Sequence, residues 1–254
     1  MDTTELDRAI DVAREAVAAA GAVAIEHSRR GVTIELKPDR SGVTAADRAA
    51  EDAIASIIER AFPDHAILGE ERGQRGTNPD ARWIVDPIDG TRGFARGGTM
   101  WGPMVALEAA GELVVGAFAL PAHRRTYWAA RGRGAFRDGT RLALSTIADV
   151  ADATLSLGEL GRMMRHNPGI ATLIERAAST RCYGDIAGCA LVLDGGAEAW
   201  IEGGVQPWDL AAPAILIAEA GGRFTDWTGA PTFEAGYGIA SNGCVHEEIL
   251  RILG

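Results

Sequence analysis

Hydrophobic residues near the start of the chain recur with the period of an α-helix. The first such set is Leu6, Ile10, Ala13, Val17 and Ala20, with charged residues between its members. This pattern predicts an amphipathic helix that runs to about residue 27. A second set, from Ala50 to Phe62, predicts another helix with one buried stripe, and Thr44 with Asp47 forms the capping pair that would open it.

Short apolar runs typical of strands lie between and after these two helices. In the first half of the chain they cover residues 32–36, 66–68, 83–86, 104–107, 113–120, 127–130 and 135–136. Pro87 cannot donate to a sheet ladder, so the strand that begins at Trp83 is predicted to end near Asp86. The polar, glycine-rich segment 73–80 predicts a loop.

In the second half, strand-like and helix-like segments alternate, which favours α/β layers. The predicted strands cover residues 154–157, 181–183, 199–201, 223–225 and 238–240, and the predicted helices cover residues 170–178, 187–193, 209–220 and 247–252. A linker is expected over residues 145–152. The pattern therefore divides the chain into an N-terminal α+β subdomain, residues 1–145, and a C-terminal α/β subdomain, residues 146–254.

Composition and charge narrow the range of functions. The 254 residues carry a formal net charge of −10, which argues against nucleic acid as a partner and would repel a phosphorylated substrate unless bound cations reversed the sign locally. No apolar stretch approaches the roughly 20 residues of a membrane span, and the acidic start is unlike a secretory signal. An odd count of three cysteines without metal-like spacing indicates free thiols and a cytoplasmic protein.

Acidic residues stand where several predicted strands and loops end. Asp86 and Asp89 lie on either side of a proline-containing turn, so both carboxylates can point to one side, where hard cations such as Mg²⁺ would bind. Gly90 and Thr91 then form a tight turn into a short helix whose free N–H groups can face an anion. Asp47 and Asp209 also stand at helix starts, where a lone acid is more often only a cap.

The order and spacing of four motifs resemble the inositol monophosphatase family over nearly the whole chain. The motifs are Val43-Thr44-Ala45-Ala46-Asp47, Leu68-Gly69-Glu70-Glu71, Trp83-Ile84-Val85-Asp86-Pro87-Ile88-Asp89-Gly90-Thr91 and Trp208-Asp209-Leu210-Ala211-Ala212. The resemblance implies a layered α-β-α-β-α sandwich of two subdomains with the site between them. It also implies Mg²⁺-dependent hydrolysis of a small phosphate monoester by a homodimer.

The resemblance also implies which residues hold metal. A first ion would be held by Glu70, Asp86 and the carbonyl of Ile88, and a second by Asp86, Asp89 and Asp209. A third ion would bind Glu70 through waters, giving two to three Mg²⁺ ions in all.

The catalytic and phosphate-binding roles follow from the same resemblance. Asp47 would brace Thr91, and Thr91 with Glu70 would orient the attacking water. The backbone N–H groups of Gly90 and Thr91 would take the phosphate. The expected substrate-binding set is Ile88, Asp89, Gly90, Thr91, Asp185, Glu202 and Asp209.

The substrate is predicted from the second half. The segments 181–185 and 128–136 look most like the histidinol-phosphate phosphatase branch, and a carboxylate at Asp185 suits a cationic amino alcohol better than a neutral polyol. Glu202 matches the family's acid that contacts the organic half of the substrate. Against these roles, Asp185 could be a plain N-cap and Glu202 a solvated loop acid. Gly93 and the small apolar run 186–189 depart from the family's usual pattern.

Three alternatives are weighed against L-histidinol phosphate hydrolysis. The first is an inositol-1-phosphate or broad sugar-phosphate phosphatase with the same metals, and the second is an inactive family member that acts as a binding protein. The third is another phosphatase chemistry, and it fails on spacing. Asp86 and Asp89 are one residue too far apart for an aspartyl-phosphate motif, no cysteine opens a C-x₅-R sequence, and no P-loop occurs.

Overall fold

The computed structural model describes residues 1–37 and 42–254. The helices within this part are α1 (Thr3–Arg30), α2 (Ala45–Ala61), α3 (Thr91–Ala95), α4 (Leu160–His166), α5 (Gly169–Arg176), α6 (Asp185–Leu193), α7 (Pro207–Glu219) and α8 (His246–Leu253). None of these described helices is long and apolar enough to cross a membrane.

Two sheets organise the molecule. The first sheet has the order β10-β9-β8-β7-β6-β5-β3-β4 and contains β3 (Ala66–Gly69), β4 (Gly73–Arg75), β5 (Ala81–Asp89), β6 (Gly102–Ala109), β7 (Glu112–Leu120), β8 (Arg125–Ala130), β9 (Gly134–Arg137) and β10 (Thr140–Arg141). The second has the order β12-β11-β13-β15-β14 and contains β11 (Thr154–Leu157), β12 (Ser179–Arg181), β13 (Ala199–Gly203), β14 (Arg223–Thr225) and β15 (Tyr237–Ser241). A short ribbon joins β1 (Glu35–Leu36) to β2 (Gly42–Val43).

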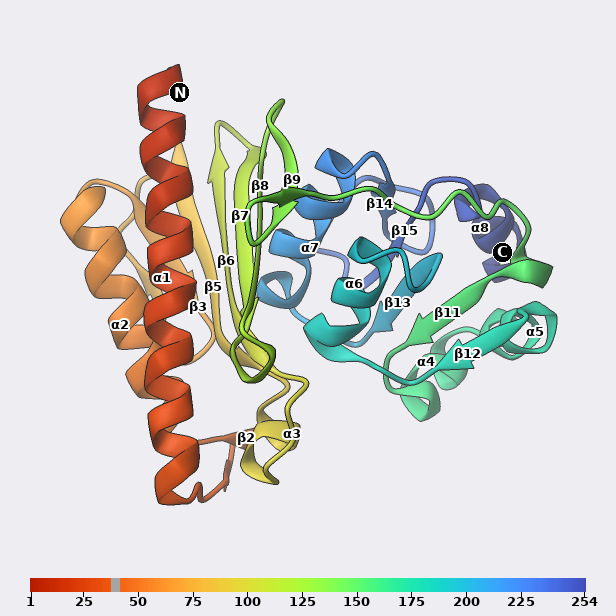
Figure 1. Ribbon diagram of the computed structural model, residues 1–254, viewed down its shortest axis with the longest axis horizontal. Coiled ribbons are helices and arrows are strands. Elements are labelled where there is room, and N and C mark those ends of the chain that lie inside the picture. Colours follow the sequence, from red (N-terminus) through yellow and green to blue (C-terminus); the bar gives the residue numbers. More distant parts are fainter. Residues whose placement is uncertain (38–41) are drawn as a thin grey trace.

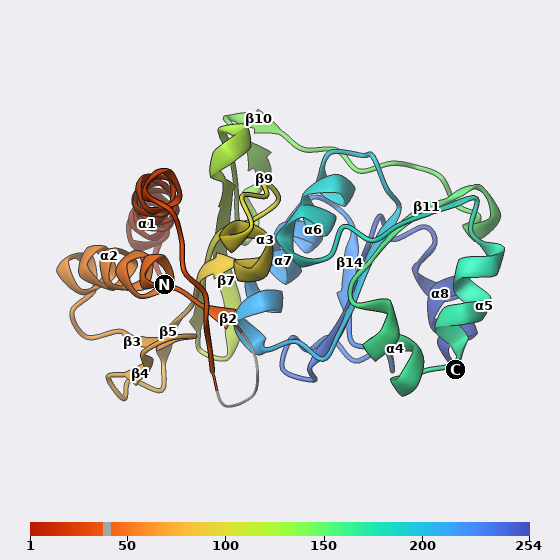
Figure 2. The same ribbon diagram turned by 90° about the horizontal axis from the view of Figure 1, so that it is seen from below.

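The helices cover the sheets in layers. Helices α1 and α2 pack on one face of the first sheet, α6 and α7 lie between the two sheets, and α4, α5 and α8 close the outer face of the second (Figures 1 and 2). The predicted layered α/β sandwich is therefore confirmed.

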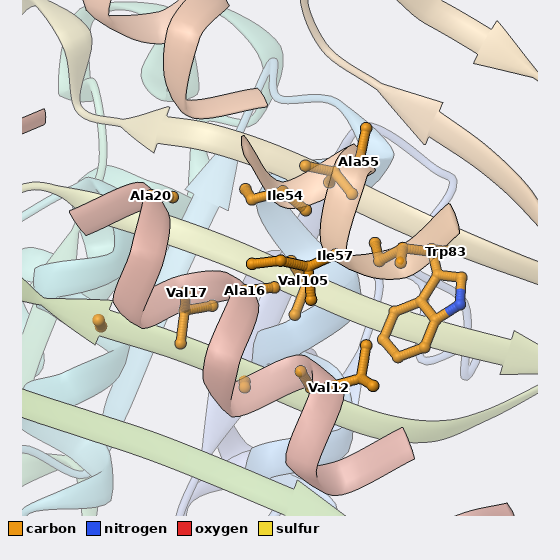
Figure 3. Close-up of a cluster of buried hydrophobic side chains, with 14 of the residues drawn as sticks. Val12, Ala16, Val17, Ala20, Ile54, Ala55, Ile57, Trp83 and Val105 are labelled. Carbon is orange, nitrogen blue, oxygen red and sulfur yellow. The ribbon is translucent and has the colours of Figure 1, made fainter. Parts of the chain in front are cut away.

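The apolar stripes of α1 and α2 form the outer core. In Figure 3, Val12, Ala16 and Val17 of α1 and Ile54 and Ile57 of α2 gather against the sheet. The small alanines of α1 let this helix lie close to α2 and to the strands beneath. Helix α1 extends three residues beyond the predicted end and stops at Gly31, whose φ of 87° is left-handed.

Several predicted boundaries are wrong. Segment 73–80 is not entirely loop, because Gly73–Arg75 pairs with β3 as a polar strand on the open edge of the sheet. The strand predicted at 181–183 lies at Ser179–Arg181, where three residues pair with β11 before the chain turns towards α6. Helix α4 was not predicted, and the expected linker 145–152 contains a 3₁₀ turn at Val150–Asp152.

Helix α7 can approach the first sheet because a glycine lies beneath it. A Cβ atom on Gly116 of β7 would lie 2.4 Å from Cγ2 of Ile215 and 3.1 Å from the carbonyl oxygen of Ala212, both on α7. The glycine therefore sets the depth at which α7, with Asp209 in its first turn, is seated.

We predict that Gly116→Ala destabilises the fold by about 1–3 kcal/mol, because the added methyl group must displace α7. The measurement is the free energy of unfolding in urea. Gly161→Ala on α4 is the matched control, since its Cβ would meet only Nη1 of Arg165 at 3.6 Å. It should be neutral or stabilise by up to about 1 kcal/mol through helix propensity. Equal losses in both variants would contradict the seating argument.

Candidate metal and phosphate site

The strand β5 carries the first acids of the site and does not end where predicted. It continues past Asp86 to Asp89, with a register shift against β6 between these two residues. Pro87 has no N–H to donate, and the N–H of Ile88 binds Oδ1 of Asp86 at 2.9 Å instead of the ladder. The proline thus makes a bulge, and the bulge brings both carboxylates to the same end of the strand.

Asp209 joins these two acids from the other side. Carboxylate oxygens of Asp86, Asp89 and Asp209 all lie within 4.8 Å of one another, and Asp86 and Asp89 are buried. Asp209 also accepts the backbone N–H of Gln206 at 2.6 Å, so it both caps α7 and faces the cluster. Three clustered carboxylates match the oxygen donors that a divalent cation such as Mg²⁺ takes, and the cluster fits such an ion.

The charges in this cluster are costly without a cation. Burial, together with the charges of Glu70, Asp89 and Asp209, raises the pKa of Asp86 well above its usual range. Burial and neighbouring acids act on Asp89 in the same direction, and burial raises the pKa of Asp209 to about 6. A bound divalent ion would reverse the local sign and keep all three acids ionised.

Glu70 lies at the edge of the cluster and faces a lysine. Nζ of Lys37 lies 2.9 Å from Oε1 of Glu70 and 2.6 Å from Oε1 of Glu71. Burial raises the pKa of Glu70 while Lys37 opposes that rise. The structure thus places Glu70 near Asp86, within reach of its charge, and pairs it with the chain's one lysine.

Lys37 and Glu51 are the two site residues that sequence reasoning missed. Glu51 is 1% exposed, and its carboxylate accepts the backbone N–H of Glu71 at 2.7 Å and of Arg72 at 2.9 Å, directly after Glu70. For Glu51, the sequence signal is its position four residues after Asp47, which places both acids on the same face of α2. The isolation of Lys37 in an otherwise arginine-based chain was the other signal.

Thr91 is held from behind by two oxygens. Its Oγ1 lies 3.1 Å from Oδ1 of Asp47 and 3.0 Å from the carbonyl oxygen of Ile88. The hydroxyl hydrogen is therefore directed inwards, which leaves a lone pair of Oγ1 for a water on the open side. The other Asp47 oxygen accepts the backbone N–H of Thr44 at 2.7 Å, completing the predicted capping box.

Gly90 makes the turn between β5 and α3. Its φ of 83° is left-handed, a conformation that a residue with a Cβ adopts only at a cost. The Cβ position is also crowded, with Oδ2 of Asp185 at 3.1 Å and the carbonyl oxygen of Met100 at 3.2 Å. The carboxylate of Asp185 therefore lies directly against the turn.

Asp185 is not the N-cap of α6, since that position belongs to Gly184. Asp185 is exposed, and its own φ of 55° is left-handed. Glu202 is not a solvated loop acid either, because it is 5% exposed at the end of β13. It accepts the backbone N–H of Asp185 and Nε1–H of Trp200, each at 3.1 Å. Both acids thus lie beside the carboxylate cluster.

Comparison with known proteins points to one family over nearly the whole chain. The model of the family described as "Inositol monophosphatase family" matches residues 5–253. A histidinol-phosphatase of Mycobacterium tuberculosis is 41% identical over 229 residues, 87% of each chain. An inositol-1-monophosphatase of Mesorhizobium japonicum is 33% identical over 87% of this chain and 86% of its own. The structure of an inositol monophosphatase from Anabaena superposes with a TM-score of 0.87 at 31% identity, covering 98% of this chain and 96% of that one.

The buried carboxylate of Glu202 predicts a pH dependence of stability. Burial raises its pKa from 4.5 to about 8, so the folded state binds this proton more tightly than the unfolded state does. The stabilisation is complete below pH 4.5 and is lost as the pH rises to about 8. Each pKa unit is worth about 1.4 kcal/mol.

We therefore expect the metal-free wild type to lose more stability between pH 4.5 and pH 8 than Glu202→Gln does. Chemical unfolding across this range measures the difference. Glu175→Gln on the surface of α5 is the control and should follow the wild type. Parallel curves for the wild type and Glu202→Gln would refute the assignment.

Glu51→Gln should loosen the turn that carries Glu70. An amide NH₂ would face one of the two backbone N–H donors, which leaves a buried donor without an acceptor at a cost of about 1–3 kcal/mol. We expect a lower Tm and a smaller rise in Tm on adding Mg²⁺. The exposed Glu59→Gln, on the same helix, should change stability by less than about 0.5 kcal/mol. An unchanged Mg²⁺ response in Glu51→Gln would show that Glu51 does not position Glu70.

Proposed function

The chain belongs to the inositol monophosphatase family, and on that premise we propose that it hydrolyses L-histidinol phosphate to L-histidinol and phosphate with Mg²⁺ as cofactor. Phosphomonoester hydrolysis is the activity named for the relatives above. The observation that carries the choice of substrate is Asp185. The residue is exposed and caps no helix, and its carboxylate lies against the Gly90 turn.

The proposed metal ligands come from both halves of the chain. Glu70, Asp86 and the Ile88 carbonyl would hold one Mg²⁺ ion, and Asp86, Asp89 and Asp209 a second, with a third near Glu70. When bound, these ions supply an acidified water and neutralise charge on the phosphate. The Ile88 carbonyl oxygen lies 3.0 Å from Thr91 Oγ1, and when it accepts that hydrogen its second lone pair remains for an ion.

The chain's own groups would position water and phosphate. Thr91 Oγ1, with its hydrogen directed towards Asp47 or Ile88, accepts a hydrogen bond from the attacking water. Glu70 accepts a hydrogen bond from the second O–H of the same water once Lys37 no longer pairs with this carboxylate. The left-handed turn at Gly90 presents the backbone N–H groups of Gly90 and Thr91 to the phosphate oxygens.

The leaving group would be recognised by charge. In histidinol phosphate, the carbon next to the one that bears the phosphate ester carries an ammonium group. A protein side chain that contacts this group should therefore be an anion. Asp185 lies against the phosphate-binding turn, and Glu202 holds the Asp185 N–H from behind. A neutral polyol would leave the Asp185 carboxylate without a charged partner, which costs affinity.

An inositol-1-phosphate or broad sugar-phosphate phosphatase is the second candidate, because the metal cluster and the Gly90 turn serve any small phosphate monoester equally. A non-catalytic binding protein is less consistent with the complete ligand set. The proposal includes a cytoplasmic homodimer. Its cytoplasmic location is supported by the free thiols of Cys182, Cys189 and Cys244.

The test of function is a comparison of two substrates with purified protein and Mg²⁺. We expect kcat/KM for L-histidinol phosphate to exceed that for myo-inositol 1-phosphate by at least about tenfold, the value of one charge-assisted contact. A reversed ratio would favour the sugar-phosphate alternative. Absence of turnover with both, and with generic phosphate esters, would favour a binding protein.

Asp185→Asn separates substrate recognition from a structural role. The substitution should raise KM for histidinol phosphate about tenfold, through loss of the charged contact, while kcat and the KM for a neutral phosphate ester change little. Asp152→Asn, in the 3₁₀ turn Val150–Asp152 where Asp152 is exposed, is the matched control. Equal losses for charged and neutral substrates in Asp185→Asn would assign this residue to the backbone turn alone.

A further inference from the structure

A cavity lies behind residues 203–206, the segment that joins Glu202 to the helix carrying Asp209. It has a volume of about 790 Å³, within the range of small-molecule sites, and lies between α4, residues 203–206, Trp227, Tyr237 and the end of α8. None of the carboxylates of the cluster at Asp86 lines it. The cavity is therefore distinct from the phosphatase site.

The charge of this cavity is opposite to that of the protein. The chain has a net charge of −10, yet among the described residues no side chain lining the cavity is acidic. Arg162 and His166 line it instead, and Arg162 has no carboxylate partner in the described part of the chain. An anion would meet the guanidinium of Arg162 there, with no acidic side chain among the described lining residues.

The aromatic wall selects flat ligands. The rings of Trp227 and Tyr237 lie with centroids 5.1 Å apart at an angle of 39° and form one side of the cavity. The indole N–H of Trp227 is buried and has no hydrogen-bond partner among the described residues. An aromatic wall beside an arginine is suited to a ring that bears a negative group.

The floor of the cavity is the link between Glu202 and α7. Two glycines let side chains of the cavity touch its backbone, because a Cβ on Gly203 would lie 2.8 Å from Cζ2 of Trp227 and one on Gly204 would lie 2.2 Å from Cδ of Arg162. Arg162 donates to the Gly204 carbonyl from one side. On the other side, the N–H groups of Gly204 and Val205 donate to the carbonyl of Gly236 at 2.7 and 3.1 Å.

This link leads into the first turn of α7, which carries Asp209. Its last residue is Gln206, whose backbone N–H is held by Asp209 at 2.6 Å. An anion that draws the guanidinium of Arg162 away from the Gly204 carbonyl would release one side of the link. Such a release would loosen the first turn of α7 and with it Asp209.

We infer that this cavity binds a small flat aromatic anion, such as a ring carboxylate, and that its occupancy weakens metal binding at Asp209. Binding itself does not depend on the proposed substrate, and the effect on metal affinity can be measured without turnover. The inference and the proposed function can therefore fail separately.

The test uses 2-naphthoate and its neutral analogue 2-naphthamide with the full chain in the presence of Mg²⁺. Isothermal titration calorimetry should show saturable binding of naphthoate and at least about tenfold weaker binding of the amide. Arg162→Gln should weaken naphthoate binding by a similar factor. Arg165→Gln, on the same helix and outside the cavity, should leave it unchanged. Equal affinity for acid and amide, or an unchanged affinity in Arg162→Gln, would overturn the inference.

Coupling is read from the Mg²⁺ dependence of Tm. In the wild type and in Arg165→Gln, saturating naphthoate should raise the Mg²⁺ concentration that gives the half-maximal Tm shift by about threefold or more. Arg162→Gln should show no such change. Saturable naphthoate binding with an unaltered Mg²⁺ response in the wild type would refute the coupling.

Discussion

Mutual repulsion among buried carboxylates is the constraint on which the rest of the structure depends. Asp86, Asp89 and Asp209 are held within 4.8 Å, in surroundings that disfavour their charges. The fold stabilises them with backbone donors, since the N–H groups of Ile88, Ile186 and Gln206 each bind one of the three. These donors compensate only in part, which leaves a negative cluster suited to a divalent cation.

The same constraint explains why the two halves must pack closely. Asp89 on β5 accepts the N–H of Ile186 on α6, so the first sheet and the middle helix layer meet at the site itself. Away from the site, Asp194 at the end of α6 binds Arg125, Arg137 and the hydroxyl of Tyr127 on the first sheet at 2.6–3.0 Å. Helix α6 is thus tied to the sheet at both ends, which fixes its first turn over the Gly90 turn.

Features encoded by neighbouring residues could be predicted from the sequence. The capping pair Thr44 and Asp47 and the short helix after Gly90 were found, since each depends on contacts a few residues apart. The end of β5 was placed wrongly because the effect of Pro87 was correctly seen as a lost donor but not as a bulge. Whether a strand stops or bulges depends on its neighbour, and β6 continues alongside to Gly102.

Contacts across the fold were beyond local reasoning. Lys37 reaches Glu70 over 33 positions, and Glu51 reaches the backbone of residues 71 and 72 over 20 and 21. No periodicity links such residues, because their proximity arises only in the folded chain, where α2 packs on β5 and Lys37 follows β1. The exposed aromatic and basic cavity behind residues 203–206 is of the same kind, since α4, β13, β15 and α8 each contribute to it.

The left-handed backbone conformation of Asp185 bears on why an acid stands at this position. A left-handed φ of 55° costs a residue with a side chain about 1–2 kcal/mol, and glycine would avoid that cost. The conformation is imposed from both sides, because Glu202 binds the N–H of Asp185 and Asp89 binds the N–H of Ile186. Since the surrounding acids already fix this turn, the carboxylate of Asp185 is not needed to form it. Its presence at a position where glycine would avoid that cost accords with the role proposed for its side chain, which lies against the Gly90 turn.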